Sequence, residues 1–229
     1  MDEHSDLDLV IAVDAPSFDE VMQERRRIAA GLGTLLAAFT GEHVGEPRVL
    51  ICLYDNPLLH VDLKFVNVEQ MGHSVDRPAV LWERSGEMSA ALKRSFAGYP
   101  EPDAAWIEER FWTWVHYGVS KVKRGELYEA LDLISFLRAR VLGPLILAKA
   151  GGKPAGVRRI EAVSPGWADE LRKTVAAYEP QSCLRAIASC AAIYRMLRSE
   201  TWTVSPAESA ALRYLQSACG VEVLGQLDC

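Results

Sequence analysis

Three aspartates lie inside segments that otherwise have the composition of buried strands. Asp6 and Asp8 lie in SDLDLVIAV (5–13), and Asp62 lies in LHVDLKFV (59–66). Because side chains alternate between the two faces of a strand, Asp6 and Asp8 point the same way. An acid inside a strand is costly unless something pairs with it. Carboxylate oxygens are the ligands that Mg²⁺ prefers, so we predict a metal site at Asp6, Asp8 and Asp62.

The same residues also have a purely structural interpretation. Alternating acids are common on solvent-exposed strand faces, and an isolated Asp-x-Asp pair is a weak signal. Lys64 and His60 share the face of Asp62 by period-two spacing. Lys64 is then a counter-ion for nearby acids, and His60 is a half-buried strand residue rather than a ligand.

Composition narrows the class of protein. The 229 residues are 49% hydrophobic, which permits one large domain or two small ones. A net charge of −6 disfavours a nucleic-acid partner, because phosphate contacts need a basic face. No apolar run is long enough for a membrane span, and the acidic start of the chain is not a signal peptide. Five cysteines without a Cys-x-x-Cys pair indicate reduced thiols, with Cys183 and Cys190 packed inward, in a cytoplasmic protein.

The pattern of elements predicts an α+β fold with two domains. Residues 1–99 are expected to form a mixed sheet with helices, and residues 104–229 a helical bundle. The boundary is YPEPD (99–103), because two prolines stop a helix and stiffen a linker. Strands are expected at 7–13, 48–54, 58–66 and 79–82, and helices at 18–39, 84–97, 104–123, 125–149, 165–177, 181–199 and 206–218. Two helix starts have N-cap signals, Ser17 and the capping box Ser205-Pro206-Ala207-Glu208.

These residues resemble a known family. The Asp-x-Asp strand and the later Asp62 resemble the carboxylate triad of the polymerase-β-like nucleotidyltransferase superfamily. The second half, through YGVSKVKRGELYEALDLISFLRAR (117–140) and GVRRIE (156–161), is similar to the helical domain of its small-molecule branch, the aminoglycoside and lincosamide enzymes. The resemblance covers most of the chain; the acid triad is its more specific part.

The resemblance implies nucleotidyl transfer. An acceptor hydroxyl would attack the α-phosphorus of ATP or another nucleoside triphosphate, and pyrophosphate would leave, so that AMP is transferred. Two Mg²⁺ ions would stabilise the attacking and leaving oxygens. Asp6 and Asp8 would hold metal and triphosphate, and Asp62 would complete the site nearest the acceptor. The expected acceptor is a small hydroxylated molecule, such as an antibiotic, and a homodimer is left open.

The resemblance also indicates nucleotide contacts. Ser5 precedes the first acid, and Tyr117 and Lys121 share one face of the helix expected at 104–123, by 100° per residue. A lysine reaches the triphosphate from the second domain in the similar antibiotic enzymes. The alternative is a solvated lysine beside Lys123 and Arg124. A general base is also expected, and Glu83, Glu87, Glu108, Glu109 and Asp62 are candidates that the sequence does not separate.

One departure from the superfamily leaves other functions open. The superfamily has a Gly-Ser turn for the phosphates upstream of the first acid, whereas only five residues precede Asp6. We therefore expect a catalytic domain truncated at its N-terminus or a start codon annotated too late. The alternatives are a non-catalytic relative that binds nucleotide or a partner, and a toxin–antitoxin-type relative. The latter is suggested by the Arg110-to-His116 spacing, which matches a helical ribonuclease motif.

Overall fold

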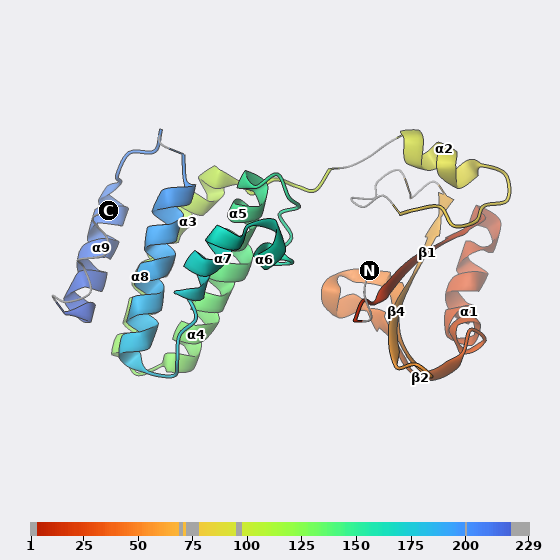
Figure 1. Ribbon diagram of the computed structural model, residues 1–229, viewed down its shortest axis with the longest axis horizontal. Coiled ribbons are helices and arrows are strands. Elements are labelled where there is room, and N and C mark those ends of the chain that lie inside the picture. The colour runs from red at the N-terminus through yellow and green to blue at the C-terminus, as the bar shows by residue number, and fades with distance from the viewer. Residues whose placement is uncertain (1–3, 69–70, 72–77, 95–97, 200, 221–229) are drawn as a thin grey trace. The chain divides into compact units, whose positions relative to one another are not determined.

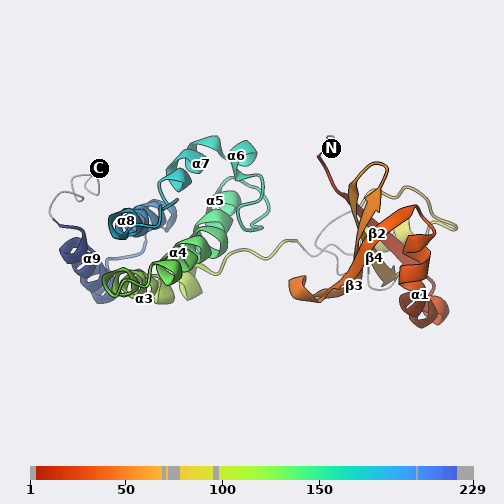
Figure 2. The same ribbon diagram turned by 90° about the horizontal axis from the view of Figure 1, so that it is seen from below.

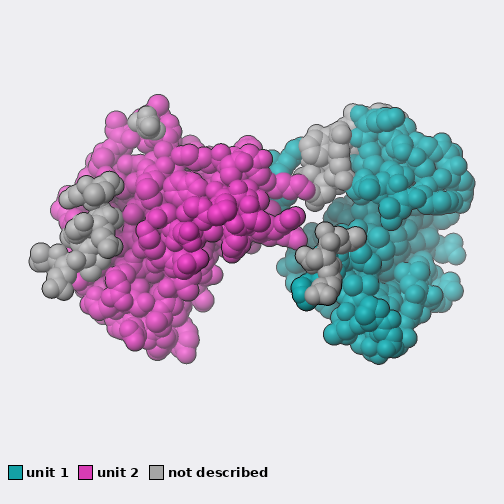
Figure 3. Space-filling view, viewed as in Figure 1, with its two compact units in different colours: residues 1–99 teal, residues 100–229 magenta. Residues whose placement is uncertain are grey.

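The junction of Tyr99 and Pro100 divides the chain into unit 1, residues 1–99, and unit 2, residues 100–229 (Figure 3). The computed structural model describes residues 4–68, 71, 78–94, 98–199 and 201–220. Unit 1 holds the strands, and unit 2 is helical in its regular structure (Figure 1). The α+β class predicted from the sequence is therefore confirmed.

Unit 1 contains a four-stranded mixed sheet in the order β1-β4-β3-β2. The outer strand β1 runs parallel to β4, while β3 is antiparallel to both β4 and β2. Parallel pairing of β1 with β4 requires a crossover, and α1, β2 and β3 form it. The strands are β1 (Leu7–Val13), β2 (Thr34–Gly41), β3 (Glu46–Asp55) and β4 (Leu59–Asn67).

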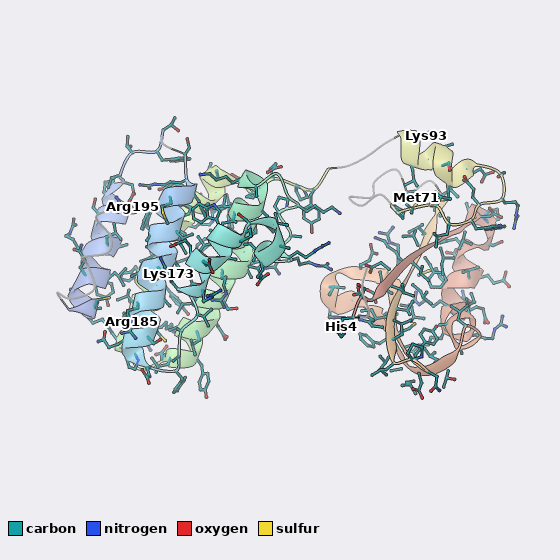
Figure 4. The ribbon with its side chains drawn as sticks, viewed as in Figure 1. His4, Met71, Lys93, Lys173, Arg185 and Arg195 are labelled. Carbon is teal, nitrogen blue, oxygen red and sulfur yellow. The ribbon has the colours of Figure 1, made fainter. Side chains whose placement is uncertain are left out.

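The two faces of this sheet are covered differently. Helix α1 (Phe18–Ala30) packs on one face, over a core that includes Leu50, Leu63 and Phe65 (Figure 2). A smaller apolar cluster joins Val66 to Met71, which Figure 4 labels, and to α2 (Glu87–Arg94). Among the described residues of unit 1, α2 covers only the apolar end of the second face, and no other helix packs over the rest. We call this uncovered part the open face.

Two elements of unit 1 differ from the sequence prediction. The helix expected over 18–39 ends at Ala30, and residues 34–41 form strand β2 instead. Gly31 follows the last helical residue, and the apolar run after Gly33 gains its backbone hydrogen bonds by pairing with β3. The strand expected at 79–82 is wrong, because these residues have no regular secondary structure. The single turn Ala15–Ser17 precedes α1, and the Ser17 side chain makes no capping hydrogen bond.

Unit 2 packs its helices around one apolar core. The helix expected over 125–149 contains a π-helical stretch, Leu137–Leu142, directly before Gly143 and Pro144. Proline lacks the N–H that a continuous α-helix needs, which accounts for this irregularity. The helices are α3 (Ala104–Lys123), α4 (Leu127–Phe136), α5 (Gly143–Lys149), α6 (Ile160–Val163), α7 (Pro165–Arg172), α8 (Pro180–Leu197) and α9 (Pro206–Cys219).

The ends and the interior of these helices follow the sequence signals. Ser205 caps α9 by accepting a hydrogen bond from the backbone N of Glu208 at 3.0 Å, as the capping box predicts. Cys183 and Cys190 are buried free thiols on α8, so the predictions that they are reduced and that they pack inward are confirmed. Cys229 lies outside the described residues. Among the helices that the structure describes, none has both the length and the apolar character needed to span a bilayer.

Candidate active site on the open sheet face

The structure brings two of the three predicted aspartates together. Asp8 of β1 and Asp62 of β4 are direct partners in the parallel register. Their strand neighbours Leu7, Leu9, Val61 and Leu63 pack toward α1, so by alternation both carboxylates project from the open face. Asp6 is exposed and lies directly before β1, two residues before Asp8. Ser5 precedes it and is half-buried.

A row of side chains crosses the sheet at this level. Asp62 is paired with Ile51 of β3, and Ile51 with Phe39 of β2. Directly paired residues of antiparallel strands have their side chains on the same face. The open face therefore carries acids on β1 and β4 and apolar side chains on β3 and β2. Sequence analysis did not find this apolar half, although the alternation of Val49, Ile51 and Leu53 with the inward-facing residues of β3 was a readable signal.

His60 contacts the acid beside it. Its Nε2 lies 2.8 Å from Oδ1 of Asp62, and both side chains are partly exposed. His60 was predicted from the sequence to be a half-buried strand residue rather than a ligand; it lies on β4 as predicted, but its side chain is exposed. The contact places the imidazole against one oxygen of the Asp62 carboxylate. An imidazole N–H that donates to one oxygen leaves the second oxygen for another ligand.

Lys64 pairs with an acid that sequence analysis did not consider. Its Nζ lies 2.8 Å from Oε2 of Glu46, at the start of β3. Arg48 donates to the same carboxylate through Nε at 2.7 Å and Nη2 at 2.6 Å. The hydrogen bond from Arg48, followed by that from Lys64, lowers the pKa of Glu46 to about 2. Lys64 therefore serves as a counter-ion of Glu46.

The donors fit a metal that shares its coordination with substrate. Throughout the described residues, no three His, Cys, Asp or Glu side chains gather closely enough to hold a metal ion by themselves. Asp8 and Asp62 form a pair of hard oxygen donors on adjacent strands. Mg²⁺ is typically held by one or two carboxylates together with water and substrate phosphates. The pair is thus suited to a Mg²⁺–phosphate complex.

The predicted nucleotide contacts of unit 2 form a cluster of their own. Lys121 of α3 pairs with Glu126 at 2.6 Å and with Glu129, and its ammonium lies over the ring of Tyr117. The Tyr117 hydroxyl donates to Glu129 at 3.3 Å. The hydrogen bond to Glu126, followed by that to Glu129, raises the pKa of Lys121 above its ordinary value. Lys121 is therefore not the solvated lysine of the alternative interpretation.

The glutamates considered as a general base lie on elements other than the strands of the sheet, and three of them already have hydrogen-bond or ion-pair partners. Glu83 accepts from the backbone N of Ser89 at 3.0 Å and from its hydroxyl, which lowers the pKa of Glu83. Glu108 accepts from Tyr194 at 2.6 Å within the core of unit 2. Glu109 pairs with Arg110, and Glu87 lies in the first turn of α2. Of the acids considered, Asp62 is the one that lies on the open face.

The ribonuclease-type spacing does not form a joint site. Arg110 and His116 are six residues apart on α3, so their side chains leave the helix about 120° apart. Arg110 packs over the Trp106 ring and donates to the Trp106 carbonyl. His116 instead stacks on Tyr214 of α9, with ring centroids 4.9 Å apart.

No protein-family model and no curated protein sequence matches this chain. Among solved structures, an aminoglycoside 6-adenyltransferase from Bacillus subtilis is similar with a TM-score of 0.45 and 17% sequence identity. The likeness covers 93% of this chain and 88% of that chain. At this level of similarity, the function is inferred from the chain's own residues.

Proposed function

We propose that this protein is a nucleotidyltransferase that moves a nucleoside monophosphate, AMP in the simplest case, from a nucleoside triphosphate to a hydroxyl of a small molecule. The observation that carries the proposal is the direct pairing of Asp8 with Asp62 on the open face. Two carboxylates on adjacent strands supply hard oxygen donors that a divalent cation can share with substrate phosphates. The free thiols fit a reducing compartment, and we place the protein in the cytoplasm.

The residues divide the work of the transfer. Asp6, Asp8 and Asp62 would hold Mg²⁺ together with the phosphate oxygens, and His60 would keep the Asp62 carboxylate oriented. Bound Mg²⁺ would neutralise charge on the phosphate oxygens and make the α-phosphorus a better electrophile. Asp62 is also our choice for the group that accepts the hydroxyl proton. Lys121, Tyr117 and Ser5 remain proposed nucleotide contacts, and a triphosphate would compete with Glu126 and Glu129 for Lys121.

Calorimetric titration tests the proposal directly. A non-hydrolysable ATP analogue is titrated into the full chain with and without Mg²⁺, and then into Asp8→Asn and Asp62→Asn. We expect binding that requires Mg²⁺ and weakens about tenfold or more in each variant. The matched control is Asp19→Asn, which removes an exposed carboxylate from α1, on the other face of the sheet.

Two outcomes would contradict the proposed nucleotidyltransferase function. Equal affinity for the ATP analogue in Asp8→Asn, Asp62→Asn and the wild type would show that the nucleotide does not bind at the open face. Mg²⁺-dependent binding that never leads to pyrophosphate release with any hydroxylated acceptor would favour the non-catalytic, nucleotide-binding alternative.

A further inference from the structure

The apolar half of the open face has no covering element among the described residues. Phe39 of β2 and Leu53 of β3 are 48% and 37% exposed, and Ile51 between them is half-buried. The Phe39 ring has a tilted contact with His43, with centroids 5.8 Å apart. Three apolar side chains on adjacent strands thus form one surface, which we call the apolar platform (Phe39, Ile51 and Leu53).

The platform adjoins the acid pair directly. Ile51 is the strand partner of Asp62, and Phe39 is the strand partner of Ile51. Neighbouring strands lie roughly 4.8 Å apart, so Phe39 is about 10 Å from Asp62 across the sheet. A single ring system beside a reacting hydroxyl covers that span. A molecule that reacts at Asp62 would therefore also contact the platform.

The chemistry of the proposed reaction decides which reactant lies there. The acceptor oxygen forms a bond to the α-phosphorus, while the bond from phosphorus to the bridging oxygen breaks and its electron pair leaves with pyrophosphate. The attacking and leaving oxygens lie in line on opposite sides of the phosphorus. Pyrophosphate is strongly charged and would lose its hydration without compensation on an apolar surface. Pyrophosphate therefore leaves toward β1, and the acceptor approaches over β3 and β2.

We propose that the acceptor carries its hydroxyl on a flat apolar or aromatic frame, which lies on the platform of Phe39, Ile51 and Leu53. The inference rests on the proposed function and narrows its substrate class. A strongly polar, polycationic amino sugar would leave this surface without a complementary partner. An aromatic alcohol would bury it and place the hydroxyl beside Asp62.

A fluorescent alcohol serves as the probe. The intrinsic fluorescence of 2-naphthalenemethanol is followed while the full chain is titrated with Mg²⁺ and the ATP analogue present. We expect the probe to bind the wild type, and Phe39→Ser and Leu53→Ser to weaken it by about tenfold and about threefold. The control is Leu81→Ser, which replaces a leucine that is 84% exposed and lies outside the sheet, and it is expected to bind like the wild type.

The outcomes separate this inference from the proposed function. No binding of the ATP analogue to the wild type contradicts the proposed function, whatever the probe does. Binding of the analogue without binding of the probe, or equal probe binding in the wild type and Phe39→Ser, overturns the platform alone. Light scattering accompanies each titration. If Phe39→Ser only converts a dimer into a monomer and the probe still binds, the platform is a self-association surface and the inference falls. Far-UV circular dichroism confirms the fold, and Leu53→Ser carries the test if Phe39→Ser does not fold.

Discussion

The charged side chains of the two units are arranged in opposite ways. In unit 2, Glu208 of α9 is fully buried and receives two hydrogen bonds, at 2.7 and 3.0 Å, from Arg198, the residue that follows α8. Arg195, which Figure 4 labels, lies 3.3 Å from the same carboxylate. In unit 1, Asp8 and Asp62 lie on an exposed sheet face, acid opposite acid. The first arrangement is a buried network of opposite charges, and the second brings two acids together on adjacent strands of an exposed face.

The buried network of unit 2 pairs its charges with other side chains of the same unit. Glu108 accepts from Tyr194 at 2.6 Å and from the Trp112 indole at 3.0 Å, so the network joins α3, α8 and α9. Burial, followed by the hydrogen bond to Glu108, raises the pKa of Tyr194 above its ordinary range. In the part of the chain that the structure describes, no buried side-chain nitrogen or oxygen lacks a hydrogen-bond partner. The charges of unit 2 therefore have a structural role, whereas for the acids of the open face we propose a role in binding.

The largest expected effect breaks the network in unit 2. Arg198→Met leaves Glu208 buried without its main counter-ion, and we expect the free energy of unfolding to fall by about 3–5 kcal/mol. Urea denaturation followed by circular dichroism measures it. Arg172→Met is the control, because Arg172 is exposed, and we expect a change within about 0.5 kcal/mol. Equal losses in the two variants would contradict the structural role of the network.

A smaller effect concerns packing. A Cβ on Gly118 of α3 would lie 2.7 Å from Cδ2 of Leu133 and 3.0 Å from Cδ1 of Ile187. We expect Gly118→Ala to cost about 1–2 kcal/mol of unfolding free energy, because overpacking exceeds the gain in helix propensity. Ala37→Val enlarges an exposed side chain on β2, and we expect it to change stability by less than about 0.5 kcal/mol. A costly Ala37→Val would mean that the open face is covered.

The Glu46 cluster should make stability depend on pH. Its pKa of about 2 means that folding favours the ionised carboxylate. The stabilisation is therefore fully present above about pH 4.5 and is lost as the pH falls toward about 2. Because the Glu46–Arg48 and Glu46–Lys64 pairs are partly exposed, we expect the free energy of unfolding of the wild type to exceed that of Glu46→Gln by only about 1 kcal/mol at pH 7. Denaturant titrations at several pH values measure this gap. Glu101→Gln is the control. A stability difference that persists at pH 2, or that Glu101→Gln reproduces, would show that it does not come from ionised Glu46.

The smallest effect concerns Lys121, which forms ion pairs within unit 2 and is also a proposed nucleotide contact. Its ammonium is paired with Glu126 and Glu129, so a phosphate has to compete for it. We expect Lys121→Gln to weaken the ATP analogue only about threefold in calorimetry. Lys123→Gln is the matched control, because Lys123 lies two residues further along α3 and about 200° around the helix from Lys121. An unchanged affinity in Lys121→Gln would make Lys121 a link between α3 and α4 alone.

The sequence predicted the main elements that position the site, because they depend on local patterns. Alternation around Asp8 and Asp62 gave the strands and the face of the acids. The N-cap at Ser205 came from local capping chemistry. The strand at 34–41 was missed because its residues have no charged position that marks a period, and only pairing with β3 selects the strand.

The contacts within the site were harder to predict. The pairing of Asp8 with Asp62 joins residues more than fifty positions apart in the chain, and a sequence pattern does not fix such a register. The Glu46–Lys64 pair depends on the irregular pairing at Gly41, and the apolar platform depends on which strands are neighbours. By contrast, the contact of His60 with Asp62 follows from period-two spacing and was open to prediction.

One paired measurement tests the central claim, that the open-face acids serve binding and not stability. The free energy of unfolding and the affinity for the Mg²⁺–ATP analogue are measured for wild type and for Asp8→Asn/Asp62→Asn. We predict that the double variant loses Mg²⁺-dependent binding, while its free energy of unfolding changes by less than about 1 kcal/mol, because the acids lie on an exposed face. A double variant that is destabilised by more than about 2 kcal/mol and still binds the analogue with unchanged affinity would contradict the account.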